Sequence, residues 1–280
     1  MEERNERGET LKEFLARYDE TKYRRPSNTV DMILLTVLKG KLKVLLVKRK
    51  DHPFIHDWAM PGGFVNFDED LDTAMKRELE EETNLFDSTY FRQLYTFGNA
   101  DRDPRTRVIT TVYLSMTPAE NIKMTSAGDD AMDTGWFTIQ KITTTSDGYE
   151  RKSVLMLDEE EKGIHLRYEI YDTACDNYVQ TRSKLLDSSN AKLAADHIKA
   201  INMAIDVVRN RAASTGIMFN LLPKECTLRE IQEVYEAIVN HPVDTGNFRR
   251  DIKKMLVATG STTIVNGRKV ATYSFNPLLP

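Results

Sequence analysis

An acidic run in the first third of the chain limits most strongly what this sequence can fold into. Residues 61–84 read PGGFVNFDEDLDTAMKRELEEETN, and residues 68–82 contain no glycine or proline. The apolar residues Leu71, Met75 and Leu79 recur every four residues, as on one face of an α-helix. The Pro-Gly-Gly before them interrupts the preceding segment. The pattern predicts a strand, a glycine loop and an acidic helix in succession.

This helix brings three of its carboxylates together. At about 100° per residue, Glu78, Glu81 and Glu82 lie within one arc of the helix surface, whereas Glu80 lies on the far side. Like charges at these spacings destabilise a helix by about 0.2–0.5 kcal/mol per pair unless a cation neutralises them. Oxygen ligands select a hard divalent ion, Mg²⁺ or Mn²⁺. The spacing favours a metal site over the alternative, a solvated acidic face.

Neighbouring residues suit a ligand that carries phosphates. Gly62 and Gly63 have no side chains, so the backbone can approach a diphosphate closely. Arg77 lies about one helical turn from Glu81 and can hold its carboxylate by a fork of hydrogen bonds.

The order of these residues resembles the Nudix box, G-x5-E-x7-R-E-U-x-E-E-x-G-U, where U is aliphatic. Gly63, Glu69 and residues 77–82 occupy its positions. The late glycine of the box is replaced by Asn84, which tolerates the left-handed conformation that glycine would supply. The resemblance implies an α+β fold, the Nudix α/β/α sandwich, in which a mixed sheet lies between helices.

The resemblance also implies a reaction, the metal-dependent attack of water on a nucleoside diphosphate linked to another group, X. Position in the box would make Arg77 the residue that orients the carboxylates and Glu69 a stabilising carboxylate. The general base stays open between a glutamate of the box and a downstream acid. The metal ligands that the box implies are Gly63, Glu78, Glu81 and Glu82.

Residues beyond the box extend the expected ligand site. The stretch NADRDPRTRVI at 99–109 and AGDDA at 127–131 look like the Nudix proteins that handle ADP-ribose-like ligands. Guanidinium groups suit phosphates and ribose hydroxyls, although charge on a surface loop is an equal alternative for each arginine. An Asp in a turn is also common for conformational reasons alone. The candidate ligand contacts are Gly62, Gly63, Arg102, Arg105, Arg107 and Asp130.

Apolar segments around the box predict strands interspersed with helix, the α/β or α+β pattern. Residues 30–38 and 43–48 are rich in Val, Ile and Leu and are separated by Lys-Gly-Lys, which predicts a β-hairpin. Trp58 and Phe64 are expected in the core rather than stacked on a base. Further strands are expected at residues 91–99, 108–116 and 136–139.

Three regions are expected along the chain. Residues 1–190 are the expected Nudix domain, in which residues 143–190 are an insertion or extension. Residues 191–222 are a linker with an amphipathic packing helix, because apolar residues recur there with helical spacing. Residues 223–280 have the outline of a winged helix-turn-helix domain.

The winged-helix prediction depends on capping and turn signals. Thr227, with Glu230 three residues later, forms a capping box at the start of one helix. A second helix, capped by residue 244 or 245, is expected to run through Leu256. Asn266-Gly267 between two β-rich runs predicts a hairpin.

Basic residues on the second helix and at the hairpin tip suggest a DNA-binding surface. Phe248, Ile252 and Met255 form an apolar face, and the cations fall on the opposite side, which could lie in a major groove. A solvated or protein-binding surface is the alternative, because acidic residues interrupt the charge. The candidate DNA contacts are Arg249, Arg250, Lys253, Lys254, Arg268 and Lys269.

Motifs of the C-terminal part look like those of the Nudix-related transcriptional regulators, the NrtR-like family. They are LAADH at 193–197, FNLLP at 219–223, TLREIQEVYEA at 227–237 and NFRR at 247–250. The resemblance implies a Nudix sensor joined to a winged helix, a homodimer, operator DNA as a partner, and control of genes of NAD metabolism or, in relatives, sugar use. ADP-ribose is the effector that the NAD branch implies. The alternative is a housekeeping Nudix hydrolase whose winged helix serves dimerisation or substrate shielding.

Composition is compatible with both hypotheses. The formal net charge of −4 excludes a protein that is basic throughout, but not a local basic patch. No apolar run approaches the roughly 20 residues that cross a bilayer. The segment MEERNERGET lacks the apolar stretch of a secretory signal, so a cytoplasmic location is expected. Cys175 and Cys226 lie far apart and predict neither a disulfide nor a zinc site.

Overall fold

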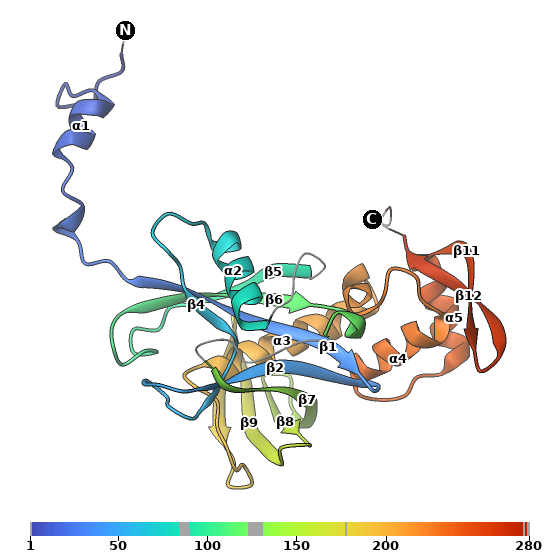
Figure 1. Cartoon of the computed structure of the whole chain (residues 1–280). Helices are drawn as coiled ribbons and strands as arrows, with labels where there is room; N and C mark the ends of the chain where they lie inside the picture. The colour runs from blue at the N-terminus through green and yellow to red at the C-terminus, as the bar shows by residue number, and fades with distance from the viewer. Residues whose placement is uncertain (1, 84–89, 123–130, 177, 277, 279–280) are drawn as a thin grey trace.

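A computed structural model of the chain describes residues 2–83, 90–122, 131–176, 178–276 and 278 (Figure 1). Within these ranges the main sheet contains β1 (Ser27–Leu38), β2 (Lys41–Arg49), β3 (Trp58–Ala59), β4 (Gly62–Phe64), β5 (Tyr90–Phe97), β6 (Val108–Met116), β7 (Ala131–Ser146), β8 (Glu150–Glu159), β9 (Ile164–Cys175) and β10 (Tyr178–Leu185). The α-helices are α1 (Leu11–Arg17), α2 (Leu71–Thr83), α3 (His197–Ala212), α4 (Leu228–Val239) and α5 (Thr245–Ile252). Short 3₁₀ turns are η1 (Glu20–Lys22), η2 (Ala119–Ile122), η3 (Gly216–Leu221) and η4 (Lys253–Met255). A separate hairpin joins β11 (Leu256–Val265) to β12 (Arg268–Phe275).

The main sheet is mixed. Its strand order is β10-β9-β8-β7-β2-β1-β6-β5, with β3 beside β2 and β4 beside β1. β1 and β6 run parallel, and their neighbours pair antiparallel. The expected hairpin of β1 and β2 is confirmed, and its turn places Lys39 and Gly40 at positive φ. This sheet between helices confirms the expected α+β sandwich.

Alternate residues of β1 face two different apolar clusters, as the two-residue period of a strand requires. The cluster beneath α2 includes Val30, Met32, Leu34, Met75 and Leu79. The cluster that contains α3 includes Ile33, Leu35, Ile198, Ile201 and Ile205. Because β1 is buried on both sides, it gives β4 a fixed strand to pair with, and the acidic helix α2 follows β4 in the chain.

Residues 143–190 continue the main sheet. They form the end of β7 and the strands β8, β9 and β10. A charged network joins these strands to α3, since the ammonium of buried Lys141 lies 2.6 Å from Asp206. Arg151 contacts both Asp206, at 2.5 Å, and Asp172, at 2.7 Å. The network therefore fixes α3 against the extended half of the sheet.

The last region folds as two helices followed by a hairpin. The structure corrects the expected end of the second helix: α5 ends at Ile252, and Leu256 already pairs with Phe275 in β11. The pairing of β11 with β12 ends the helix before Leu256, and helix propensity alone does not predict this end. The hairpin turn is confirmed, with Asn266 at φ 50° and Gly267 at φ 76°, the values of a tight type I′ turn.

The winged helix packs directly on the main domain. Ile231 and Ile238 of α4, and Phe248 of α5, belong to the same apolar cluster as α3 and one face of the main sheet. The guanidinium of Arg209 on α3 donates a hydrogen bond of 2.9 Å to the carbonyl of Ile238, at the end of α4. One apolar core therefore runs through both domains.

The capping boxes at the two ends of the chain are a matched pair for measuring stability. In each, the N-cap threonine accepts from an amide three residues on, and a glutamate accepts from the threonine amide: Thr227 with Glu230, and Thr10 with Glu13. Because α4 packs in the core, Thr227→Ala is expected to lower the free energy of unfolding by about 1 kcal/mol in urea titrations. Thr10→Ala is expected to leave it unchanged, because no residue of α1 is buried. Equal losses from both variants would contradict this assignment.

The N-terminal arm that carries α1 extends away from the main sheet (Figure 1). In the part of the chain that the structure describes, no helix is long and apolar enough to span a membrane.

Candidate nucleotide and DNA sites

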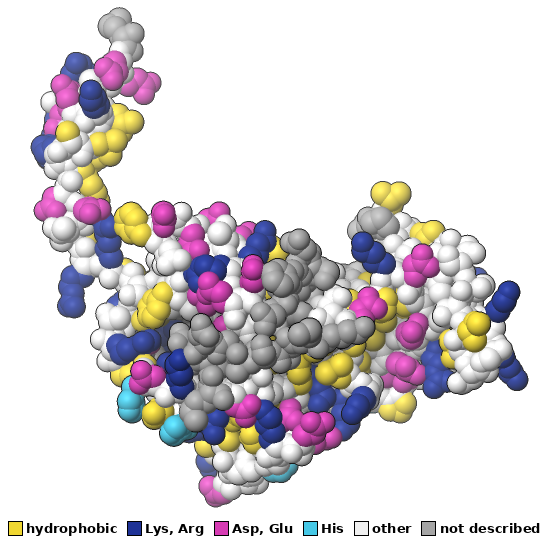
Figure 2. Space-filling view, viewed as in Figure 1, with side chains coloured by type: hydrophobic (Ala, Val, Ile, Leu, Met, Phe, Trp, Pro, Cys, Tyr) yellow, Lys and Arg dark blue, Asp and Glu magenta, His cyan; other side chains and the backbone are white. Residues whose placement is uncertain are grey.

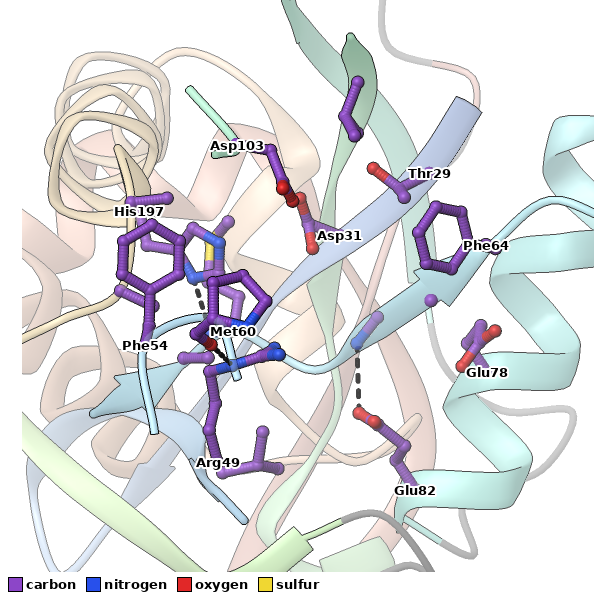
Figure 3. Close-up of a pocket in the computed structure, with 18 of the residues that line it drawn as sticks. Thr29, Asp31, Arg49, Phe54, Met60, Phe64, Glu78, Glu82, Asp103 and His197 are labelled. Atoms are coloured by element: carbon purple, nitrogen blue, oxygen red, sulfur yellow. Dashed lines mark hydrogen bonds between the residues drawn. The ribbon is translucent and has the colours of Figure 1, made fainter. Parts of the chain in front are cut away.

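A cavity of about 530 Å³ opens between the glycine loop, α2 and the start of α3 (Figure 3). Its walls come from β1, β2, β4 and α2, from the loop that precedes β6, and from Ala194, Ala195 and His197. Charged residues of both signs line it. The cations are Lys48, Arg49, Lys50, Arg77, Arg102 and Arg105. The acids are Asp31, Asp51, Glu78, Glu81, Glu82 and Asp103.

The glycine loop and the acidic helix interlock. The amide of Gly62 donates a hydrogen bond of 3.0 Å to Glu82 Oε2. A Cβ atom on Gly63 would lie 2.1 Å from Glu78 Oε1, so only glycine leaves room for this carboxylate. Glu78 is buried, at 8% exposure, whereas Glu81 is exposed. The box thus places its three expected carboxylates around one cavity, at different depths.

Arg77 orients the acids on both sides of it. Its Nη1 donates to Glu78 at 2.7 Å and to Glu81 at 3.2 Å. Its Nη2 donates to Glu69 at 2.6 Å and to the carbonyl of Phe64 at 3.1 Å. One guanidinium therefore ties the helix, the glycine strand and the loop between them together, as the spacing suggests.

Two of the acids that Arg77 contacts have pKa values shifted in opposite directions. Burial raises the pKa of the Glu78 carboxyl, even though Arg77 opposes the shift. Hydrogen bonds from Arg77 lower the pKa of Glu69, so this acid stays ionised. A buried carboxylate whose charged form is disfavoured gains from a nearby cation, and oxygen-only donors suit a hard divalent ion. The donor set therefore fits a divalent ion. In the described ranges, however, no three or more acidic, His or Cys side chains are already gathered around one metal position.

The raised pKa leads to a prediction about stability. In a chelator, without divalent metal, Glu78→Gln is expected to raise the free energy of unfolding at pH 7, because the variant buries no charge. The difference from the wild type should shrink as the pH falls through the raised pKa of Glu78, since protonation also neutralises the wild-type side chain. Urea titrations at several pH values measure both effects. A variant that is less stable at pH 7 would show that the Arg77 contact outweighs burial.

The three arginines of the loop before β6 occupy different environments. Arg102 is buried, with 6% of its side chain exposed, and holds Asp196 through two hydrogen bonds of 2.9 and 3.3 Å. Arg105 pairs with Asp103 at 2.8 Å and lines the cavity. Arg107 donates to the carbonyl of Asn99 at 2.8 Å and is not among the residues that line the cavity.

The start of α3 completes the cavity. The motif LAADH at 193–197 resembles that of a known family, but its place in the ligand site did not follow from the sequence. The ring Nδ1 of His197 accepts a hydrogen bond of 2.9 Å from the amide of Met60 (Figure 3). Burial lowers the pKa of His197, which keeps the ring neutral and able to accept. Arg102 also lies 3.8 Å from the buried Asp31. No local motif signals these contacts, because the partners are far apart in the sequence.

The environment of Phe64 corrects another expectation. Trp58 is in the core, as expected, but Phe64 is 47% exposed and lines the cavity. The guanidinium of Arg105 lies 5.5 Å from the centroid of its ring. β4, which carries this side chain, pairs with β1 and lines the cavity. Asn84 of the box and the candidate Asp130 lie outside the described residues.

The winged helix presents basic side chains on its outer surface. Arg249 and Arg250 are exposed on α5, opposite the buried Phe248 and Ile252. Arg250 is held by hydrogen bonds to Asp251 and Asn247. Lys253 and Lys254 are exposed in η4, and Arg268 and Lys269 follow the hairpin turn. Figure 2 shows Lys and Arg side chains along the outer edge of this domain.

Comparison with known proteins identifies the family. The NUDIX domain family matches residues 26–157. An ADP-ribose pyrophosphatase from Methanocaldococcus jannaschii is 34% identical over 143 residues, which are 50% of this chain and 80% of that protein. The chain belongs to the Nudix family. The glycine loop, α2 and the cavity are thus parts of a Nudix domain.

The relatives also include proteins with both domains. The NrtR DNA-binding winged helix domain family matches residues 218–275. The ADPR responsive transcriptional repressor NtrR of Acinetobacter baylyi is 28% identical over 266 residues, covering 94% of this chain and 87% of that protein. This Nudix protein therefore has the two-domain organisation of the NrtR-like regulators.

Solved structures agree over nearly the whole chain. A MutT/nudix family protein from Enterococcus faecalis aligns with a TM-score of 0.70 at 29% identity, covering 97% of this chain and 95% of that one. Shewanella oneidensis NrtR, crystallised with a 27mer DNA, aligns with a TM-score of 0.62 at 26% identity, covering 89% and 93%.

Proposed function

We propose that this Nudix protein is a DNA-binding transcriptional regulator that responds to ADP-ribose, and that its Nudix site also hydrolyses this ligand with Mg²⁺ or Mn²⁺. The proposal includes a homodimer, because two winged helices related by a two-fold axis match the symmetry of typical operators. The observation that carries it is the likeness to a whole ADPR responsive repressor, which includes both domains of this chain.

The cavity supports the ligand class. A diphosphate needs cations, and Arg105 offers one at the opening, where the ring of Phe64 is also exposed. When bound, a divalent ion would polarise the diphosphate and activate water. In this proposal Glu78, Glu81, Glu82 and the backbone of Gly63 hold that ion. Arg77 and Glu69 keep these carboxylates in position, and Gly62 holds Glu82.

The winged helix supports the DNA half of the proposal. The exposed cations of α5 and η4 would lie against the phosphates that border a major groove, and Arg268 and Lys269 would act as a wing. The test is a mobility-shift titration at low salt with DNA from upstream of the protein's own gene, with and without ADP-ribose. We expect a shift that ADP-ribose changes and that Arg249→Glu/Arg250→Glu abolishes. The control, Arg182→Glu/Lys184→Glu on β10, should bind like the wild type.

Hydrolysis is tested separately, by the release of AMP from ADP-ribose in the presence of Mg²⁺. Glu82→Gln should slow it strongly, whereas Glu80→Gln, on the exposed opposite side of α2, should not. If the wild type releases no AMP, the hydrolase part is wrong and the cavity is only a sensor.

One observation favours a second candidate function. The box retains every acid that the Nudix reaction requires, which a pure sensor does not need. The alternative is therefore a housekeeping pyrophosphohydrolase whose winged helix serves dimerisation or substrate shielding. AMP release without DNA binding at low salt would support this alternative and reject the regulator.

A further inference from the structure

A second cavity, which we call the junction cavity, lies where the two domains meet. Its volume is about 840 Å³, within the range of small-molecule sites. Tyr90 and Arg92 of β5 line it from the Nudix domain, and Ser274 and Phe275 of β12 line it from the winged helix. Arg211, at the end of α3, lies between them in sequence and also lines the cavity. In the described ranges it shares no lining residue with the first cavity.

Aromatic side chains form one wall of the junction cavity. The rings of Phe219 and Phe275 lie 4.9 Å apart between centroids, at an interplanar angle of 31°. A Cβ atom on Gly216 would lie 2.3 Å from the ring of Phe275, so the glycine lets that ring take this position. Tyr90 is half-buried and lines the same space. An aromatic wall of this kind can pack against a planar aromatic group.

Cations without acidic partners among the described residues also line the junction cavity. Arg92, Arg211 and Lys224 are exposed and line the cavity, and none makes a side-chain ion pair or hydrogen bond with a described residue. No Asp or Glu occurs among the described lining residues, although the chain as a whole carries a net charge of −4. At the first cavity, by contrast, Arg77 and Arg102 are already engaged by carboxylates. Unpaired guanidinium and ammonium groups around an aromatic wall suit a phosphate attached to an aromatic ring.

We propose that the junction cavity binds a nucleoside phosphate. The base would stack against Phe219 and Phe275, and the phosphate would contact Arg92, Arg211 and Lys224. Because β5 and β12 belong to different domains, one bound nucleotide would contact both domains (Figure 1). The junction cavity would thus be a second effector site, separate from the Nudix site. Its existence does not depend on whether the chain regulates transcription or hydrolyses ADP-ribose.

The first test measures AMP binding by isothermal titration calorimetry, using the full chain in a chelator. Arg92→Gln/Arg211→Gln is expected to weaken AMP binding by at least about tenfold, since the variant loses two charge-assisted contacts to the phosphate. The control Lys12→Gln/Arg24→Gln removes two exposed cations from the N-terminal arm and should bind AMP like the wild type. No AMP binding by the wild type, or equal binding by both double variants, would overturn the proposal.

The second test locates the base directly. After irradiation with 2-azidoadenosine 5′-monophosphate, the label is expected in peptides that contain Phe219 or Phe275. Label confined to peptides that contain Phe54 or Phe64 would assign AMP to the Nudix site and overturn the proposal. Inorganic phosphate that binds as tightly as AMP would also overturn it, because the aromatic wall would then contribute nothing. The proposal would also be overturned if the wild type bound no AMP and Arg92→Gln/Arg211→Gln lost operator binding. These cations would then contact DNA.

Discussion

Replacing Gly63 with alanine is expected to reduce the hydrolysis of ADP-ribose by at least about 100-fold, because catalytic geometry tolerates little displacement. The added Cβ would lie 2.1 Å from Glu78 Oε1 and within 2.6 Å of the rest of that carboxylate. The obstructing atoms are the end of a flexible side chain, so the backbone need not move. Glu78 would swing away from the glycine loop, and the site would lose its buried carboxylate while the fold remains. The measurement is the rate of AMP release at saturating Mg²⁺, together with a urea titration of the same protein.

The matched control for this variant is Gly98→Ala. Gly98 lies just after β5, and a Cβ there would be 3.8 Å from the nearest atom, on Arg107, an ordinary contact distance. We expect this variant to keep its activity. If Gly63→Ala retained wild-type activity, Glu78 could not be a necessary part of the catalytic site.

Replacing Arg102 with alanine is expected to lower the free energy of unfolding by about 3–5 kcal/mol, the range found when one partner of a buried ion pair is removed. The change would leave the carboxylate of Asp196 without its two hydrogen bonds and Asp31 without its nearest cation in the described structure. Urea titration monitored by circular dichroism measures the loss. Arg102→Ala/Asp196→Ala should recover part of it, because one unpaired charge is then removed.

Arg105→Ala is the control for Arg102→Ala. Arg105 follows Arg102 by three positions in the same loop. Arg105 is about half exposed and pairs with Asp103, so its removal should lower the free energy of unfolding by less than about 1 kcal/mol. Similar losses from the two variants would mean that the Arg102 pairs are no stronger than surface pairs.

Local spacing was sufficient to find the parts of the site that lie on one helix. Glu78, Glu81, Glu82 and Arg77 are within five positions of one another, so helical geometry alone brings them to one side. The glycine loop precedes that helix in the chain, but the hydrogen bond from Gly62 to Glu82 spans 20 positions and depends on how α2 packs beside β4. Local spacing also found the α4 capping box and the Asn266-Gly267 turn, which are local hydrogen-bond patterns.

Contacts between distant segments could not be predicted in this way. Arg102 and Asp196 are 94 positions apart, and Met60 and His197 are 137 apart. Which charged groups meet depends on how α3 packs across the sheet, and no periodicity encodes that. Arg102 lines the cavity, so its ligand contact stays a prediction, but sequence spacing did not show that its guanidinium pairs with Asp31 and Asp196. The predicted end of α5 was wrong for the same reason. The pairing of β11 with β12 sets where this helix ends.

The apolar core shared by the two domains has a consequence for how the molecule melts. Since α4 and α5 bury their side chains in the cluster that contains α3 and one face of the main sheet, heat should disrupt both domains together. Ligand bound only in the Nudix cavity would then raise the melting temperature reported by a probe on the hairpin of β11 and β12. The winged helix would then move with the Nudix domain as one rigid unit, and ligand binding would change the orientation of that whole unit on DNA.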